Sequence, residues 1–208
     1  MKLIVGATGA FQQGKQEVGN VWKDLGWEFV DINKYVNEVH IRDRNGLYTD
    51  LGLAELGLRE DGGEHLFYFQ RLMRNPDIHR IVQDHEVAYV TDRLREDLPL
   101  IKNTRIVISW GYVFQLLDSF QFDHVVLFEA QQDVWFRRVR RVFERFGHSG
   151  ESITEAEIIE LATAIEMNPD VIRNVVQSKC QGKWSRLDTS TDDWGEQDLK
   201  KLITTNGW

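Results

Sequence analysis

The 208-residue chain has few residues of the kinds that build disulfide scaffolds, linkers or membrane spans. Its single cysteine, Cys180, excludes an internal disulfide and a metal site made of several cysteines. Only three prolines interrupt it, and no repeat or Pro/Gly/Ser-rich linker divides it, so we expect one domain over residues 1–208. No apolar run approaches the roughly 20 residues that span a bilayer, and Gly6 breaks the apolar start too early for a signal peptide. We therefore expect a cytoplasmic protein with no membrane partner.

The chain also lacks an excess of basic residues, since its formal net charge is -8. Non-specific affinity for nucleic acid comes from Lys and Arg side chains that displace counterions. The charge therefore disfavours a nucleic-acid partner, although a local basic groove stays open. The sequence does not fix the oligomeric state, and a homodimer is left open.

Short apolar runs alternate with segments of helical apolar spacing along the whole chain. The expected strands are residues 2–6, 28–30, 87–91, 105–110, 124–128 and 185–187. The expected helices are residues 15–25, 64–83, 134–146, 153–167, 169–178 and 197–203. This alternation predicts an α/β fold with a parallel sheet covered by helices. Residues 42–63 contain five glycines, so we expect a mobile loop there with at most short helices.

The residues after the first predicted strand have the spacing of a phosphate-binding loop. Gly9 is followed by four residues and then by Gly14 and Lys15. Glycines let the backbone curl its N–H groups around a phosphate, the lysine neutralises phosphate oxygens, and the following helix adds its dipole. The residues expected to bind nucleotide are Gly9, Gln13, Gly14, Lys15 and Gln16. The alternative is an ordinary glycine-bearing turn with an exposed lysine.

One position departs from the phosphate-loop pattern. Gln16 stands where Ser or Thr normally coordinates Mg²⁺ through a hydroxyl. An amide oxygen holds a metal-bound water less well than a hydroxyl holds the ion. Gln16 therefore bears more on catalysis than on the fold.

With this loop in place, residues 25–33 (LGWEFVDIN) resemble the second strand of small-molecule P-loop kinases, especially dephospho-CoA kinases. The resemblance implies that Asp31, at the strand end, faces the phosphates. There it would orient the acceptor hydroxyl, accept its proton or hold Mg²⁺, which makes it a catalytic and a metal candidate. A helix N-cap is the alternative role for a strand-terminal Asp.

Residues 90–96 (VTDRLRE) resemble a strand-end segment of phage-type deoxynucleoside monophosphate kinases. The resemblance implies a substrate-binding role for Asp92, Arg93 and Arg95. Arg93 or Arg95 would grip the acceptor phosphate, and Asp92 would lie near the metal. A capped helix with surface charges is the alternative.

Residues 122–130 (FDHVVLFEA) and the arginines that follow resemble the fourth strand and the lid helix of the same kinases. Arginines of such a lid stabilise the charge of the transferring phosphoryl group. Arg138 and Arg141 are the catalytic candidates, because they form a neighbouring pair on a helix. A solvated basic face is the alternative. Residues 185–190 and 199–203 resemble the last strand and helix of these kinases.

Together these resemblances imply a P-loop kinase-like three-layer sandwich with a parallel sheet of five or six strands. They imply an acceptor-binding helical insert over about residues 37–84 and a lid region over about residues 133–180. The implied activity is transfer of phosphate from ATP, with Mg²⁺, to a small nucleotide acceptor such as a (deoxy)nucleoside monophosphate. The alternatives are a kinase for dephospho-CoA or a modified base in DNA, a nucleotide-binding regulatory module that has lost its chemistry, and a scaffold with a vestigial loop.

Overall fold

The computed structural model describes residues 2–13, 18–53, 75–146, 153–191 and 195–208. A parallel sheet with strand order β2-β3-β1-β4-β5 forms its centre. Its strands are β1 (Leu3–Thr8), β2 (Glu28–Asp31), β3 (Arg105–Ser109), β4 (His124–Glu129) and β5 (Trp184–Asp188). The predicted α/β fold is confirmed, and five of the six predicted strands are present.

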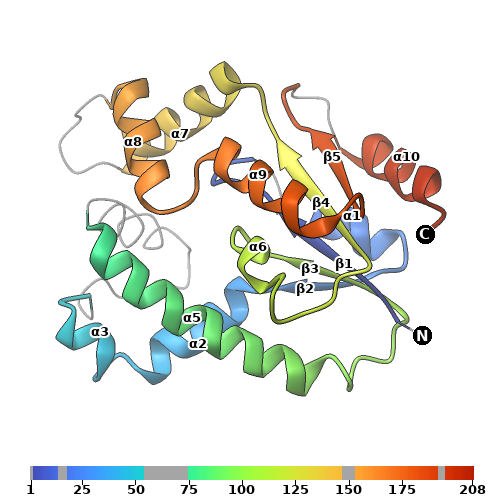
Figure 1. Ribbon diagram of the computed structural model, residues 1–208, viewed down its shortest axis with the longest axis horizontal. Helices are drawn as coiled ribbons and strands as arrows, with labels where there is room; N and C mark the ends of the chain where they lie inside the picture. Colours follow the sequence, from blue (N-terminus) through green and yellow to red (C-terminus); the bar gives the residue numbers. More distant parts are fainter. Residues whose placement is uncertain (1, 14–17, 54–74, 147–152, 192–194) are drawn as a thin grey trace.

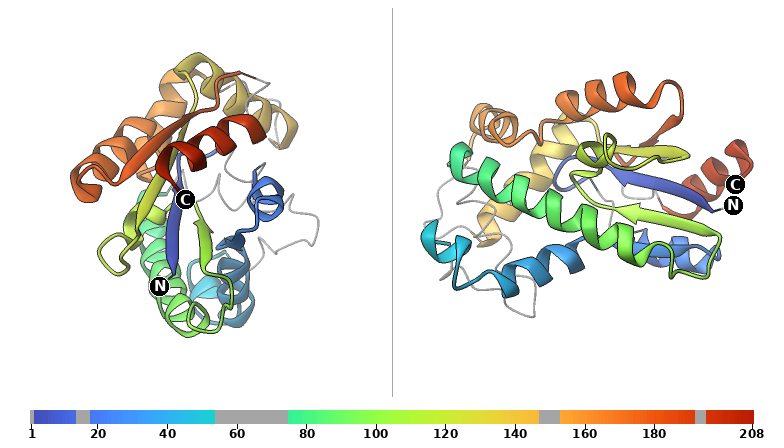
Figure 2. Two further views of the ribbon diagram at one scale, coloured as in Figure 1. Left: turned by 90° about the vertical axis from the view of Figure 1, so that its right-hand side faces the viewer. Right: turned by 60° about the horizontal axis from the view of Figure 1, so that its bottom comes forward.

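Helices cover both faces of the sheet (Figure 1). They are α1 (Gly19–Asp24), α2 (Asn33–Arg42), α3 (Leu47–Asp50), α5 (Pro76–Asp97), α6 (Val113–Leu116), α7 (Gln132–Phe146), α8 (Glu155–Ala164), α9 (Pro169–Cys180) and α10 (Glu196–Asn206). In the left view of Figure 2, α1 lies on one side of the strands, and α5 and α9 lie on the other. The three predicted layers are therefore present.

Side chains of alternate strand residues enter two separate cores, as the two-residue period of a strand requires. In β4, Val126 and Phe128 pack with Trp22 of α1 and Leu199 of α10. The intervening residues of β4 point to the opposite face, where Leu127 belongs to the core that includes residues of α5, α6 and α9. Burial on both faces explains why the strands are short, nearly continuous apolar runs.

The strand predicted at residues 87–91 is wrong, because these residues lie inside α5. The run of Val87, Tyr89, Val90 and Thr91 favours a strand by composition. However, Asn75 caps the helix by accepting a hydrogen bond from the Ile78 N–H, and Pro76 starts it. One face of the helix then packs into the core on this side of the sheet, and this packing outweighs the preference of residues 87–91 for a strand.

Helix α5 is attached to the core at both ends. Near its start, His79 Nε2 lies 2.9 Å from the hydroxyl of Tyr112, which follows β3. Near its end, Asp97 accepts a hydrogen bond of 2.8 Å from Tyr35 of α2. The ammonium group of Lys2, which precedes β1, donates to the carbonyl of Leu98 just beyond α5. The helix therefore runs from the carboxyl edge of the sheet to the amino edge.

The predicted insert is described only in part. Its predicted loop at residues 42–63 contains the short helix α3, while residues 54–63 lie outside the described residues. The predicted insert boundary at residue 84 falls within α5. The division into core, insert and lid stays a prediction. Among the helices that are described, none is both long and apolar enough to cross a membrane.

Candidate functional site

The phosphate loop begins at the carboxyl end of the central strand β1. Gly9 has a φ of +154°, and a Cβ atom at this position would lie 2.5 Å from the carbonyl oxygen of Phe128. Gln12 adopts a left-handed φ of +62°. The backbone therefore turns tightly where a phosphate-binding loop requires it, and only glycine fits at position 9. Gly14, Lys15 and Gln16 lie outside the described residues.

Side chains fasten the described half of this loop. Gln13 is fully buried, and its Oε1 accepts a hydrogen bond of 2.8 Å from the Ala10 N–H. Its Nε2 has no hydrogen-bond partner among the described residues. Trp135 of α7 donates its indole N–H to the carbonyl of Phe11 at 2.9 Å. The loop is thus held from within by Gln13 and from outside by α7.

The turn after β3 packs beside the phosphate loop. The Thr8 hydroxyl donates to the carbonyl of Gly111 at 2.9 Å, and the Trp110 N–H donates to the carbonyl of Ala7 at 3.1 Å. A Cβ atom on Gly111 would lie 2.8 Å from Met167, which follows α8. This turn therefore connects the end of β1 to the region predicted as the lid.

Asp31 lies at the carboxyl end of β2, in register with Ser109 of β3. Its Oδ1 accepts a hydrogen bond of 3.0 Å from the Asn33 N–H at the start of α2. The predicted strand-end position is confirmed, and the alternative reading as a cap for the next helix also has support. One strand, β3, separates β2 from β1. The catalytic and metal-binding roles of Asp31 stay predictions.

The two predicted lid arginines differ in their surroundings. Arg138 of α7 donates to the carbonyl of Thr189, beyond β5, at 2.7 Å. Arg141, also on α7, is exposed. The structure thus places Arg138 against the carboxyl edge of β5 and leaves Arg141 at the surface. Their catalytic role stays a prediction.

Asp92, Arg93 and Arg95 lie on the last turns of α5, because the strand that was predicted before them is helical. Arg93 makes ion pairs with Glu96 and Asp97, and Arg95 with Asp92. Arg93 Nε also lies 3.7 Å from a carboxylate oxygen of Glu38 on α2, the helix that follows the carboxyl end of β2. The expected strand-end position is therefore wrong, and the substrate-binding role of these three residues stays a prediction. The observed contacts correspond to the alternative, a helix with surface charges.

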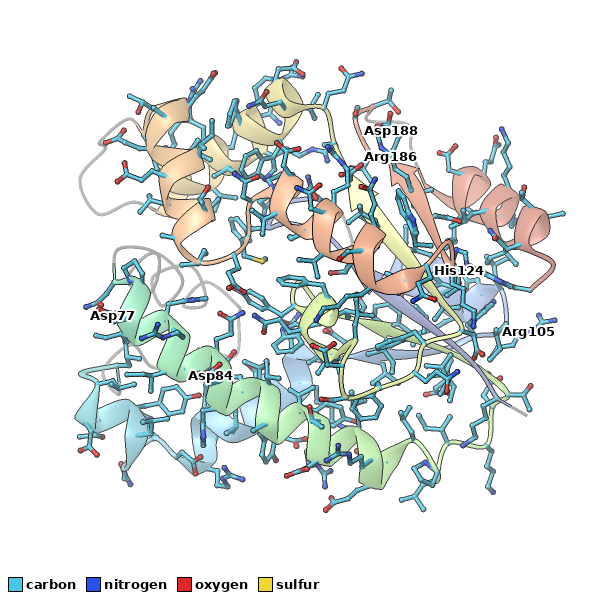
Figure 3. All side chains as sticks on the ribbon, viewed as in Figure 1. Asp77, Asp84, Arg105, His124, Arg186 and Asp188 are labelled. Carbon is cyan, nitrogen blue, oxygen red and sulfur yellow. The ribbon has the colours of Figure 1, made fainter. Side chains whose placement is uncertain are left out.

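Sequence reasoning gave no role to a buried charge cluster at the end of β4. Glu129 has an exposed side-chain fraction of 1% and pairs with Arg173 of α9 and Arg186 of β5. The sequence did hold one signal for it. Glu129 is an acidic residue at the end of an apolar strand, as Asp31 is at the end of β2. Figure 3 shows Arg186 next to Asp188 at this end of the sheet.

His79 and Tyr112 form a buried polar contact between α5 and the turn after β3. Burial lowers the pKa of His79 to about 4 and raises the pKa of Tyr112 well above its usual value. His79 is therefore neutral near pH 7. The Tyr112 hydroxyl also lies 3.5 Å from the carbonyl of Ile165, which follows α8. This contact joins the end of the predicted insert to the region predicted as the lid.

We expect the free energy of unfolding to fall as the pH is lowered from about 6.5 to 4. In this window the unfolded chain protonates His79 while the folded protein does not, so acid favours the unfolded state. The full effect is on the order of 3 kcal/mol. Denaturant unfolding at pH 7 and pH 4.5 measures it. His79→Gln should reduce the difference, and an equal difference in both proteins would contradict the prediction.

The described residues suit a nucleotide with Mg²⁺, although they include no group of three His, Cys, Asp or Glu side chains that could hold a metal ion. Mg²⁺ beside phosphates is usually held by one or two carboxylates together with the phosphates themselves. A single carboxylate such as that of Asp31 is in keeping with this pattern. The close approach of backbone at Gly9 is the feature that a phosphate cradle needs.

The parallel sheet, its strand order and the tight loop after β1 define a P-loop kinase-like fold. TT1252 from Thermus thermophilus is 16% identical, with a TM-score of 0.58 over 99% of this chain and 96% of that chain. Shikimate kinase from Acinetobacter baumannii, in complex with shikimate, is 13% identical, with a TM-score of 0.52 over 100% and 94%. Dephospho-CoA kinase from Campylobacter jejuni is 15% identical, with a TM-score of 0.51 over 99% and 98%.

The sequence itself matches no protein-family model and no curated protein. At identities of 13–16%, the likeness to solved structures establishes the fold alone. The identity of the substrate must therefore be argued from this chain's own residues.

Proposed function

We propose that this protein is a kinase that transfers the γ-phosphoryl group of ATP, with Mg²⁺, to a small nucleotide acceptor such as a (deoxy)nucleoside monophosphate. The observation that carries the proposal is the turn at Gly9–Gln13, between the central strand and α1, where only glycine fits at the first position. This is the position and the backbone geometry of a phosphate-binding loop. The P-loop kinase-like fold of the whole chain supports the same reading.

Each candidate residue has a distinct role in this proposal. Lys15 and the loop amides hold the donor phosphates, and Asp31 orients the acceptor or holds Mg²⁺. Arg138 and Arg141 balance the negative charge that spreads over the transferring group. Bound ATP supplies the phosphoryl group, so the protein's own contribution is positioning and electrostatic stabilisation.

Calorimetric titration of ATP with and without Mg²⁺, followed by a product assay with nucleoside monophosphates and dephospho-CoA, tests the proposal. Micromolar Mg²⁺-assisted binding and turnover of one acceptor are the expected results. No binding of ATP would contradict the proposal and leave residues 9–15 as an ordinary turn.

A modified base in DNA is an alternative acceptor, and it is distinguished by salt. Binding to DNA releases counterions, so turnover of a DNA substrate would fall steeply with ionic strength. Turnover of a mononucleotide should change little between about 50 and 200 mM salt. Over the same range of salt concentration, binding to DNA weakens strongly. The net charge of -8 favours the mononucleotide.

A regulatory module that binds nucleotide without turnover is the second candidate function. The observation that favours it is Gln16, which replaces the hydroxyl that normally coordinates Mg²⁺. This candidate predicts ATP binding that depends little on Mg²⁺ and no product with any acceptor. Gln16→Ser discriminates the two functions, because it should strengthen Mg²⁺-dependent turnover in an enzyme.

A further inference from the structure

The last residue of β4 is a buried carboxylate with two cationic partners. The Nε atom of Arg173, on α9, lies 2.6 Å from Glu129 Oε1. The Nε atom of Arg186, on β5, lies 2.8 Å from Glu129 Oε2, as an ion-pair contact that is not aligned as a hydrogen bond. The exposed fraction of the side chain is 1% for Glu129, 38% for Arg173 and 50% for Arg186. The acid is thus buried, while both arginine side chains are partly exposed.

This cluster lies beside the start of the phosphate loop. Thr8, the last residue of β1, is in register with Leu127 of β4. Beyond that pair, the backbone of Gly9 packs against the Phe128 carbonyl, which belongs to the peptide bond that joins Phe128 to Glu129. Arg186 itself lies level with Leu127 on the neighbouring strand. The two guanidinium groups therefore lie at the same edge of the sheet as the loop.

Other charged groups also lie at this edge of the sheet. Asp170, at the start of α9, accepts a hydrogen bond of 2.8 Å from Arg173. Hydrogen bonds from Ser190 lower the pKa of Asp188, so this acid is also charged. Arg138 donates to the carbonyl of Thr189, whose N–H donates to the carbonyl of Glu129. Three arginines thus lie around the ends of β4 and β5.

A buried carboxylate such as Glu129 is unexpected beside a site for negatively charged phosphates. A buried carboxylate is costly, and it repels a phosphate strongly where water does not screen it. Arg173, Arg186 and Arg138 together balance the three carboxylates of Glu129, Asp170 and Asp188 at this edge. Each guanidinium has five N–H donors in a planar fork, and the contacts with Glu129 and Asp170 use only part of them. Fixed in this way, the remaining donors are pre-organised for phosphate oxygens.

We propose that Glu129 is a positioning residue that holds Arg173 and Arg186 beside the phosphate loop, where the two arginines contact the phosphates of bound nucleotide. The proposal rests on the proposed nucleotide-binding function. It adds Arg173 and Arg186 to the residues that bind the phosphates, and it gives the buried acid a role in their placement.

The test compares Glu129→Gln, Arg173→Gln and Arg186→Gln in Mg-ATP binding by calorimetry and in turnover. Arg105→Gln is the matched control, because Arg105 is an exposed arginine at the first residue of β3, at the opposite edge of the sheet (Figure 3). Each arginine variant should raise the Kd for Mg-ATP by about tenfold or more, as expected for loss of a charged hydrogen bond. The control should bind like the wild type.

Glu129→Gln separates positioning from simple charge and from a structural role. The substitution removes a negative charge, so if charge alone mattered it would tighten Mg-ATP binding; a positioning role predicts weaker binding. In the Arg173→Gln background, Glu129→Gln should weaken Mg-ATP binding little further, because both substitutions disrupt the same Glu129–Arg173 ion pair. Tighter binding, or a lower melting temperature with unchanged Kd, would overturn the proposal.

The two proposals fail in different ways. If the wild type does not bind Mg-ATP, the proposed function and this inference both fall. If the wild type binds and turns over ATP while Arg173→Gln and Arg186→Gln match the Arg105→Gln control, only this inference falls. Arg186→Gln is the variant expected to fold normally, because it shortens a half-exposed side chain and leaves no buried cavity. Its effect on the Kd therefore decides the proposal even if the other variants are unstable.

Discussion

Replacing Lys15 by alanine should lower kcat/KM for ATP by about 100- to 1,000-fold, the effect of losing one pre-organised group that stabilises charge in the transition state. The lysine is the loop's one cationic side chain, and phosphoryl transfer depends on electrostatic stabilisation more than on covalent chemistry by the protein. Steady-state turnover with the best acceptor of the panel measures the effect.

The matched control is Lys23→Ala, which removes an exposed lysine from the last turn of α1. It makes the same change of charge outside the phosphate loop, and turnover should stay within about twofold of the wild type, as for ordinary surface substitutions. Full activity of Lys15→Ala would contradict the kinase assignment. Equal losses in both variants would point to a general effect of charge.

Gly9→Ala should abolish ATP binding and also destabilise the fold. The new Cβ would lie 2.5 Å from the Phe128 carbonyl, and a backbone atom in the middle of a sheet cannot move aside as a flexible side chain can. The left-handed φ of +154° adds strain of about 1–3 kcal/mol for a residue with a side chain. Calorimetric titration of ATP and denaturant unfolding measure the two effects.

Gly26→Ala controls for the backbone conformation alone. Gly26 has a φ of +83°, but no atom lies within 4 Å of the position that a Cβ would take. It should therefore lose stability only from the strain of a left-handed residue, about 1–2 kcal/mol, and should keep ATP binding. Normal ATP binding by Gly9→Ala would contradict the geometry of the loop.

The sheet could be predicted from the sequence because its strands are buried on both faces. Residues 124–128 form an almost continuous apolar run, which is typical of a short strand buried on both faces. Residues 87–91 have a similar composition, yet they belong to a helix of 22 residues. The cap at Asn75 and the packing of the whole helix decide this, and neither can be read from five residues.

The candidate site was predictable where a motif fixes the backbone and hidden where the tertiary structure brings side chains together. Gly9 could be identified from its spacing to Lys15 alone. Glu129, Arg173 and Arg186 come from β4, α9 and β5, and their ion pairs depend on strand pairing that the sequence does not show. Arg93 and Arg95 were misplaced for the same reason, because their position depended on one strand that is a helix.

The attachment of α5 at both ends bears on how this helix can move relative to the sheet. His79 fixes the first turns to Tyr112, while Asp97 and the Leu98 carbonyl fix the other end to Tyr35 and Lys2. A helix held at both ends in this way should not move relative to the sheet. For the proposed kinase, spin labels on α5 and β3 should therefore keep the same separation with and without bound ATP, and a changed separation would contradict this expectation.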